Sequence, residues 1–254
     1  MEFLSPQFLI PLFFLTALVY SMAGFGGGST YLALLAFFSF PYALMPKIAL
    51  LCNLTVVTGG TWFFYKEGYL SWRRILPFII SSIPMAYWGG SVVVGKRLFT
   101  LLLAISLIVA ALRLFLSDRA FEAKMPLEWK KSWIVGLPLG AVLGFLSGLV
   151  GIGGGIYFAP VLLLLGWADA KQAAASASLF ILVNSVAGLA GQFAKGEGFI
   201  SVEGIVPLVV AVFLGGQIGS RIGARSVPKL VLQRMTAVLI LFVSGRLLWG
   251  FLGL

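Results

Sequence analysis

Two short glycine-rich runs are the residues of this chain best suited to bind a ligand. The first is Gly24-Phe25-Gly26-Gly27-Gly28, followed by Ser29, and the second is Gly151-Ile152-Gly153-Gly154-Gly155. Each run lies inside a strongly apolar segment, where three consecutive glycines are expected to interrupt a helix. A helix that starts after such a break presents unbonded N–H groups and a partial positive charge. The runs therefore predict two backbone sites for an anion, with no charged side chain required.

Close packing is the alternative role for these glycines, because small residues let membrane helices approach one another. A single run would favour that alternative. Here the whole pattern is repeated with the same spacing between its glycines, and a short apolar segment follows each copy. Interrupted segments at corresponding positions of two halves are typical of a transporter's binding site. We therefore expect the runs to line a substrate path at membrane depth.

Polar side chains within the apolar segments form the second group of candidates. Such side chains are costly in lipid and usually face a cavity or a neighbouring helix. Serine hydroxyls can bond the carbonyl one turn earlier, so most of them are expected to be structural. The amide side chains of Asn and Gln are less easily satisfied by hydrogen bonds within their own helix. The candidates for the substrate path are Asn53, Ser176, Ser178, Asn184 and Gln217.

The chain lacks the residues on which several other chemistries depend. It has no His and only one Cys, which excludes an intramolecular disulfide and the usual zinc sites. All eight Asp and Glu residues lie in expected loops or at the ends of apolar segments, so no carboxylate proton relay is expected within the membrane. No general base stands beside a nucleophile. We therefore expect neither an enzyme nor a bound cofactor or metal.

The composition is that of an integral membrane protein. The 254 residues are 60% hydrophobic and 10% charged, and they include several apolar stretches long enough to cross a lipid bilayer. The net charge of +10 is concentrated between those stretches, as the positive-inside rule describes. Nucleic acid is therefore not an expected partner. Basic residues near segment ends, such as Lys47 and Lys171, are expected to extend toward the membrane interface.

The glycine runs occupy the same place in two similar halves. Residues 1–116 are expected to form one membrane repeat, 117–131 a polar linker, and 132–254 the second repeat. The expected helices are 3–24, 29–40, 47–65, 75–94, 98–116, 132–150, 156–166, 171–194, 204–222 and 231–252. This pattern predicts an all-α membrane protein of about eight transmembrane helices, with two short broken or re-entrant helices after the glycine runs.

The distribution of positive charge indicates how the halves are oriented. If each short segment returns the chain to the side from which it came, the two halves are inverted relative to each other. That arrangement puts most of the 18 Lys and Arg residues on the linker side, whereas two halves of equal orientation divide them almost evenly. The positive-inside rule favours the first arrangement. We therefore expect inverted repeats, a cytoplasmic linker and both termini outside.

The chain resembles the sulfite exporter TauE/SafE family over essentially its whole length. The resemblance rests on the two glycine runs, on Pro160, on the sequence Ala175-Ser176-Ala177-Ser178-Leu179 and on the turn at 195–201. It implies a bacterial inner-membrane permease of about eight spans that exports small sulfur-containing anions, such as sulfite, sulfoacetate or other organosulfonates. The first repeat departs from the pattern, because Ala33 stands where the second has Pro160.

The leading hypothesis is an anion transporter in which inverted repeats rock around a site at the membrane midplane. Its partners are a small anion and the lipid bilayer, and a homodimer is also considered. The alternative is a membrane scaffold or assembly factor, which would not be stabilised by small sulfur anions. The candidate substrate-binding residues are Gly26, Gly27, Gly28, Ser29, Asn53, Gly153, Gly154, Gly155, Ser176, Ser178, Asn184 and Gln217.

Overall fold

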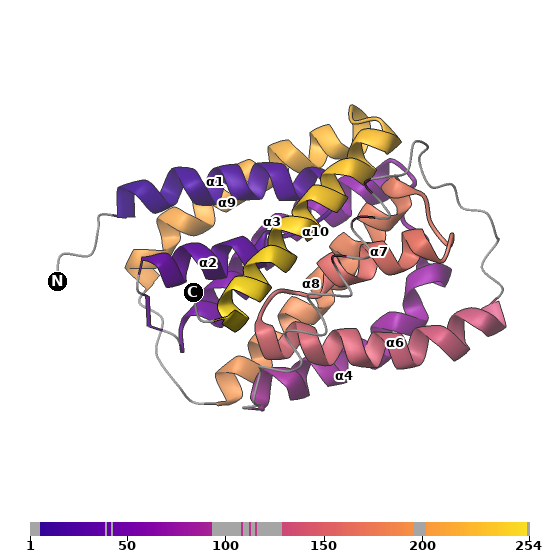
Figure 1. Ribbon diagram of the computed structural model, residues 1–254, viewed down its shortest axis with the longest axis horizontal. Helices are drawn as coiled ribbons and strands as arrows, with labels where there is room; N and C mark the ends of the chain where they lie inside the picture. The colour runs from indigo at the N-terminus through magenta and orange to yellow at the C-terminus, as the bar shows by residue number, and fades with distance from the viewer. Residues whose placement is uncertain are drawn as a thin grey trace.

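The computed structural model describes residues 6–38, 40–41, 43–92, 108, 112, 115, 129–195 and 202–252, and the regular structure among them is helical (Figure 1). The helices of the first half are α1 Pro6–Met22, α2 Gly28–Phe37, α3 Met45–Lys66 and α4 Trp72–Ser91. Those of the second half are α6 Trp129–Val150, α7 Gly155–Leu164, α8 Ala170–Ala194, α9 Val202–Arg225 and α10 Lys229–Leu252.

The helices follow the predicted segments to within a few residues. One difference is that α6 begins at Trp129, so the last three residues of the predicted linker are helical. The rest of that linker, and most of the predicted span 98–116, lie outside the described residues. Among the described helices, four are long and apolar enough to cross a membrane: Met45–Lys66, Trp129–Val150, Ala170–Ala194 and Ile205–Arg225. The chain is thus an all-α, multi-pass membrane protein, and the count of about eight spans stays a prediction.

Both predicted helix breaks are present. The chain leaves α1 after Met22 and begins α2 at Gly28, and it leaves α6 after Val150 and begins α7 at Gly155. Five glycines in these breaks have positive φ, a conformation that other residues rarely adopt: Gly24, Gly27, Gly151, Gly153 and Gly154. The helix is therefore interrupted in each half where glycines adopt a backbone conformation that other residues rarely tolerate.

The two breaks have the same hydrogen-bond pattern. In the first, the carbonyl oxygen of Gly27 accepts from the N–H groups of Thr30 and Tyr31. In the second, the carbonyl oxygen of Gly154 accepts from those of Tyr157 and Phe158. The first N–H groups that donate within α2 and α7 are therefore those of Thr30 and Tyr157. The N–H groups of the helical residues before them have no acceptor within the helix.

Aromatic stacking holds each short helix in place. The ring of Tyr31 on α2 stacks on Phe13 of α1, with 4.7 Å between ring centroids. The ring of Phe158 on α7 stacks on Phe180 of α8, with 4.5 Å between centroids. Such pairs contribute about 0.5–1.5 kcal/mol each beyond the burial of their surface. Both breaks are therefore fixed by packing immediately after the glycines.

An antiparallel pair of helices, α3 and α8, forms the centre of the bundle. Leu50 near the start of α3 lies beside Gly188 near the end of α8, and Gly60 lies beside Ser178. The first turn of α8 has a capping box, in which the Asp169 carboxylate accepts from the N–H of Gln172 and the Gln172 side chain accepts from the N–H of Asp169. The contacts of Leu50 with Gly188 and of Gly60 with Ser178 place the start of each central helix beside the end of the other.

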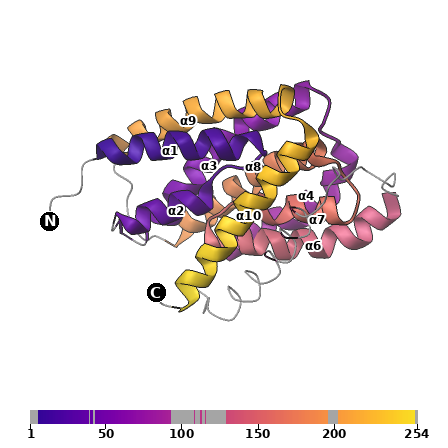
Figure 2. The ribbon, with the colours of Figure 1, turned by 45° about the horizontal axis from the view of Figure 1, so that its top comes forward.

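Two parallel pairs flank the centre, with α1 against α9 on one side and α4 against α6 on the other (Figures 1 and 2). Glycines allow these close contacts: a Cβ added to Gly148 of α6 would overlap the carbonyl oxygen of Ala86, and one added to Gly219 of α9 would overlap that of Leu18. The helix α10 crosses the bundle and contacts α8 (Figure 2). Small residues thus have their usual packing role in membrane helices here, away from the breaks.

Candidate functional site

The two helix breaks meet at Asn53, a fully buried residue of α3. Its Nδ2 donates to the carbonyl oxygen of Ile152 in the second glycine run, over 2.9 Å. A Cβ added to Gly26 of the first run would overlap Asn53 Oδ1. One added to Gly28 would lie 2.5 Å from Asn53 Nδ2 and 3.1 Å from the Ile152 oxygen. A single amide side chain therefore contacts both runs.

Residues of α8 enclose the second run from the other side. A Cβ added to Gly153 would lie 2.7 Å from Cγ2 of Ile181, 3.0 Å from Nδ2 of Asn53 and 3.1 Å from Oγ of Ser185. One added to Gly155 would overlap the Ile181 side chain. Ile181 thus packs on Gly155 as Asn53 packs on Gly28, so one of two corresponding positions is polar and the other is apolar.

Three buried oxygens beside the glycine runs have no hydrogen-bond partner among the described residues: Asn53 Oδ1, Ser147 Oγ and Ser185 Oγ. The Ser147 hydroxyl lies 3.3 Å from the position of a Cβ on Gly154. An unpaired buried polar group costs about 1–3 kcal/mol, so its presence calls for an explanation. The two hydroxyls can rotate to donate to a bound ion. Gly28, where α2 begins, and Gly153, two residues before α7, both lie beside the Asn53 amide, so the starts of both short helices are near it.

The site is electrically neutral apart from its helix ends. The side chains that contact the glycines of the two runs are amide, hydroxyl, aromatic and aliphatic groups. Within the described part of the chain, no group of three His, Cys, Asp or Glu residues could hold a metal ion. The partial positive charges at the starts of α2 and α7 are thus unopposed by a nearby carboxylate among these contacts, which favours a negatively charged ligand.

The structure brings only part of the predicted site together. Asn53 and both glycine runs meet, and Ser29 is buried in the first turn of α2. Ser178 lies elsewhere: its hydroxyl donates to the carbonyl oxygen of Val57 and accepts from Thr61 Oγ1, each over 3.2 Å. The Gln217 side chain of α9 lies against Gly59. Ser178 and Gln217 therefore contact α3 about one to two turns after Asn53, and not at the glycine runs.

The other two predicted residues lie on α8 and are fully buried. The Nδ2 of Asn184 donates to the carbonyl oxygen of Phe180 one turn earlier, over 2.8 Å. Ser176 has no partner for its hydroxyl among the described residues. Neither is among the contacts of the glycine runs, so both remain predictions as substrate ligands.

Two residues at the breaks, Ser147 and Ser185, were not among the predicted site residues. Helical spacing could have identified Ser185, because it shares the face of α8 that carries Ser178 and Ile181. Ser147 lies one turn before the second glycine run, and its backbone carbonyl oxygen accepts a hydrogen bond from the N–H of Gly151. Once the end of α6 is known, the sequence therefore predicts that Ser147 lies near the second glycine run.

Lys47 and Lys171 do not extend to the interface, and that expectation was wrong. The two side chains are 2% and 8% exposed. Lys171 Nζ donates to the carbonyl oxygen of Ala224 over 2.9 Å and lies 5.2 Å from the centroid of the Tyr69 ring. Lys47 Nζ lies 5.2 Å from the centroid of the Phe193 ring. Both ammonium groups stay inside because the bundle offers them aromatic faces and, for Lys171, a carbonyl at the end of α9.

Comparison of the sequence with known protein families identifies the family of the chain. The sequence pattern of one family, described as sulfite exporter TauE/SafE, matches residues 9–247, which is nearly the whole chain. The chain belongs to the TauE/SafE family. Both glycine runs, Asn53 and the buried lysines fall inside the matched region of this TauE/SafE protein.

Relatives of this TauE/SafE protein occur in bacteria and archaea. It is 36% identical over 240 residues to the probable membrane transporter protein y4hK of Sinorhizobium fredii, which covers 93% of this chain and 96% of the relative. It is 28% identical to the probable membrane transporter proteins YunE of Bacillus subtilis, over 92% and 94% of the two chains, and MJ0441 of Methanocaldococcus jannaschii, over 91% of each. No solved structure matches the chain. The TauE/SafE protein is accordingly a membrane transporter and not an enzyme.

Proposed function

We propose that this TauE/SafE protein exports small sulfur-containing anions, such as sulfite, sulfoacetate or other organosulfonates, through a site between its two helix breaks. The observation that carries the proposal is the position of Asn53, whose amide contacts both glycine runs. The starts of α2 and α7, the Asn53 amide and the nearby hydroxyls offer several neutral donors. Such a set suits an oxyanion, whose charge is spread over oxygens that each accept hydrogen bonds.

The helix contacts support inverted repeats, built from residues 1–116 and 132–254 and joined by the linker 117–131. In the proposed repeats, α1, α2, α3 and α4 correspond to α6, α7, α8 and α9. The contacts occur in matching pairs: α4 with α6 and α9 with α1, α4 with α8 and α9 with α3, and α2 with α3 and α7 with α8. The corresponding helices α3 and α8 run antiparallel. A two-fold axis in the membrane plane produces that relation, whereas an axis along the membrane normal would leave them parallel.

The contacts of the breaks follow the same symmetry. Gly24 in the first break packs on Ala174 near the start of α8, and Gly151 in the second packs on Pro46 near the start of α3. Each break therefore rests on the central helix of the other half. Rocking of one repeat against the other would move each break relative to a helix that it touches, which is how the proposed site would open to one side of the membrane at a time.

Export can run on the membrane potential alone in this proposal. An anion that leaves an inside-negative cell gains about 2.3 kcal/mol per charge for each 100 mV. We propose a bacterial inner membrane, a cytoplasmic linker and outer termini, the orientation that the positive-inside rule favours. The arrangement described here is closed, because every residue from 23 to 29 and from 151 to 160 is buried.

Flux measurements on two variants of α3 test the site. Purified protein in liposomes is loaded with sulfite, and efflux is measured for the parent, Asn53→Leu and Thr58→Val. Asn53→Leu keeps a similar volume and removes the amide that contacts both runs, so we expect at least a tenfold loss of flux. Thr58→Val is the matched control, since Thr58 is exposed and bonds within its own helix.

A thermal-shift measurement separates transport from the alternative role. A carrier is stabilised by its substrate, so sulfite or sulfoacetate should raise the Tm of the parent and not that of Asn53→Leu. Near-parental flux in Asn53→Leu would contradict the proposed site. Parental protein that neither transports nor is stabilised by any of these anions would favour a scaffold or assembly factor.

A further inference from the structure

Two buried lysines lie at opposite ends of the central pair, and each faces an aromatic ring from the other half. Lys171 lies in the first turn of α8, with its Nζ 5.2 Å from the Tyr69 ring that follows α3. Lys47 lies in the first turn of α3, with its Nζ 5.2 Å from the Phe193 ring near the end of α8. Because α3 and α8 are antiparallel, the same contact is formed once at each end of the pair.

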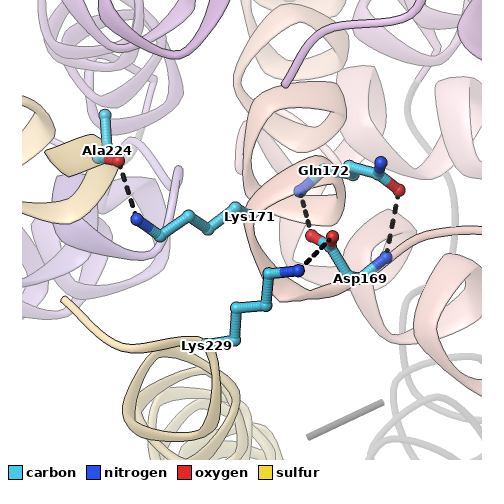
Figure 3. A network of polar contacts seen from close by, with 5 residues as sticks. All are labelled: Asp169, Lys171, Gln172, Ala224 and Lys229. Atoms are coloured by element: carbon cyan, nitrogen blue, oxygen red, sulfur yellow. Dashed lines mark hydrogen bonds and ion pairs between the residues drawn. The ribbon is translucent and has the colours of Figure 1, made fainter. Parts of the chain in front are cut away.

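This enclosure is unusual for lysine, which is rarely buried and normally extends to water from the end of a membrane helix. A salt bridge does not account for the position of Lys171. The neighbouring carboxylate of Asp169 is bound by the N–H of Gln172 at 2.9 Å and by Lys229 Nζ at 3.0 Å. Lys171 points away from that carboxylate toward Ala224 at the end of α9 (Figure 3). Its ammonium group therefore faces groups without a full negative charge.

We propose that Lys47 and Lys171 are charge-selecting residues of two gates, one at each mouth of the substrate path. The inference rests on the proposed anion export. In each gate the lysine and the ring belong to different halves, so rocking of the repeats must separate them. The released ammonium group then meets the entering anion, which offers it a full negative charge. For Lys171, the closed gate offers a carbonyl oxygen and an aromatic ring in its place.

The state of the two gates agrees with the rest of the structure. Both lysine–ring contacts are formed, and the glycine runs between them are buried. At the end that holds Lys171, a second contact joins the halves: Arg225 Nε on α9 lies 2.6 Å from Glu67 Oε1 after α3. Opening at this end must break both contacts, whereas the opposite gate can stay closed at the same time.

The gates are tested by the access of a thiol reagent to the site from each side of the membrane. The reporter is Ser185→Cys in a Cys52→Ala background, which leaves one cysteine beside the second glycine run. Right-side-out and inside-out vesicles are treated with a membrane-impermeant maleimide. We expect Lys171→Met to raise the labelling rate at least fivefold from the linker side only. Lys47→Met should raise it from the opposite side only.

Ring variants and a matched control make the result specific. Tyr69→Leu and Phe193→Leu remove the ring and keep the lysine, so each should raise labelling from the same side as its partner's variant while keeping most of the sulfite flux. The lysine variants should lose at least tenfold in sulfite flux, and the Lys→Arg variants should recover part of it. Lys66→Met is the control, because Lys66 is exposed near the linker-side end of α3.

The two proposals fail in different ways. Side-specific labelling in a parent that carries no sulfite or sulfoacetate would refute anion export and keep the gates. Unchanged labelling in all four gate variants, in a parent that exports sulfite, would refute the gates and keep the export. Equal increases from both sides would also refute the gates, since they would show general loosening of the bundle.

Discussion

Gly153→Ala gives a direct measure of how tightly the breaks are packed. Gly153 has a φ of +86°, and an added Cβ would lie within about 3 Å of three side chains, those of Ile181, Asn53 and Ser185. A left-handed conformation costs an alanine about 1–2 kcal/mol, and overpacking costs about 1–3 kcal/mol more. The lower conformational entropy of the unfolded chain with alanine offsets about 0.4–1 kcal/mol of this cost. The expected net destabilisation is about 1–5 kcal/mol, from these three contributions.

Gly68→Ala is the matched control for this variant. Gly68 also has a positive φ, of +78°, but nothing lies within 4 Å of the added Cβ. It should therefore show only the conformational cost, about 1 kcal/mol after the gain from the unfolded chain. The difference between the two variants isolates the packing of the site from the strain of the backbone.

Thermal unfolding in detergent and sulfite flux from liposomes provide the two readouts. We expect a clearly larger fall in Tm for Gly153→Ala than for Gly68→Ala, and loss of flux in Gly153→Ala alone. Equal falls in Tm would show that the neighbours of Gly153 yield without cost. Together with parental flux in Gly153→Ala, that result would refute the reasoning that the closed break leaves no room for a side chain.

Three further predictions concern the contacts that hold the helices together. Asp169→Ala removes the N-cap of α8 and should cost about 1–2 kcal/mol in thermal unfolding, whereas Asp169→Asn keeps an N-cap oxygen and should cost less. Gly148→Leu would force α4 away from α6 and should yield aggregated protein on size-exclusion chromatography, while Gly245→Leu, with nothing within 4 Å, should remain monodisperse. Arg225→Ala breaks a solvent-exposed ion pair and should cost less than about 1 kcal/mol, an effect that high salt removes in the parent.

The helix breaks could be predicted from the sequence because their cause is local. Three adjacent glycines lower the stability of a helix wherever they occur, and the repetition of the run identified its importance. Helix ends were equally accessible, since prolines, loops and apolar length determine them. These features depend on a few neighbouring residues, so the neighbours in the sequence are sufficient to predict them.

The composition of the site depends on how helices far apart in the sequence face one another. Asn53 and Gln217 are both amides within apolar segments, and only the packing of α3 on α8 and α9 separates their environments. Ser185 lies at the second break and Ser178 does not, although they share one face of α8. The burial of Lys171 depends on the end of α9 and on the ring of Tyr69. No local pattern carries that information.

The unequal pair of residues beside the short helices has a consequence for energetics. A protein made of two identical inverted halves would have inward-open and outward-open states of equal free energy, because each would be the other turned over. Asn53 packs against Gly28 and Ile181 against Gly155, so one short helix begins beside an amide and the other beside a hydrocarbon. In the proposed carrier, this difference would remove that degeneracy. In an open state of the proposed carrier, entering water would solvate the amide and not the isoleucine. An inverted-repeat carrier with this difference therefore has a preferred resting side even without a substrate or a membrane potential.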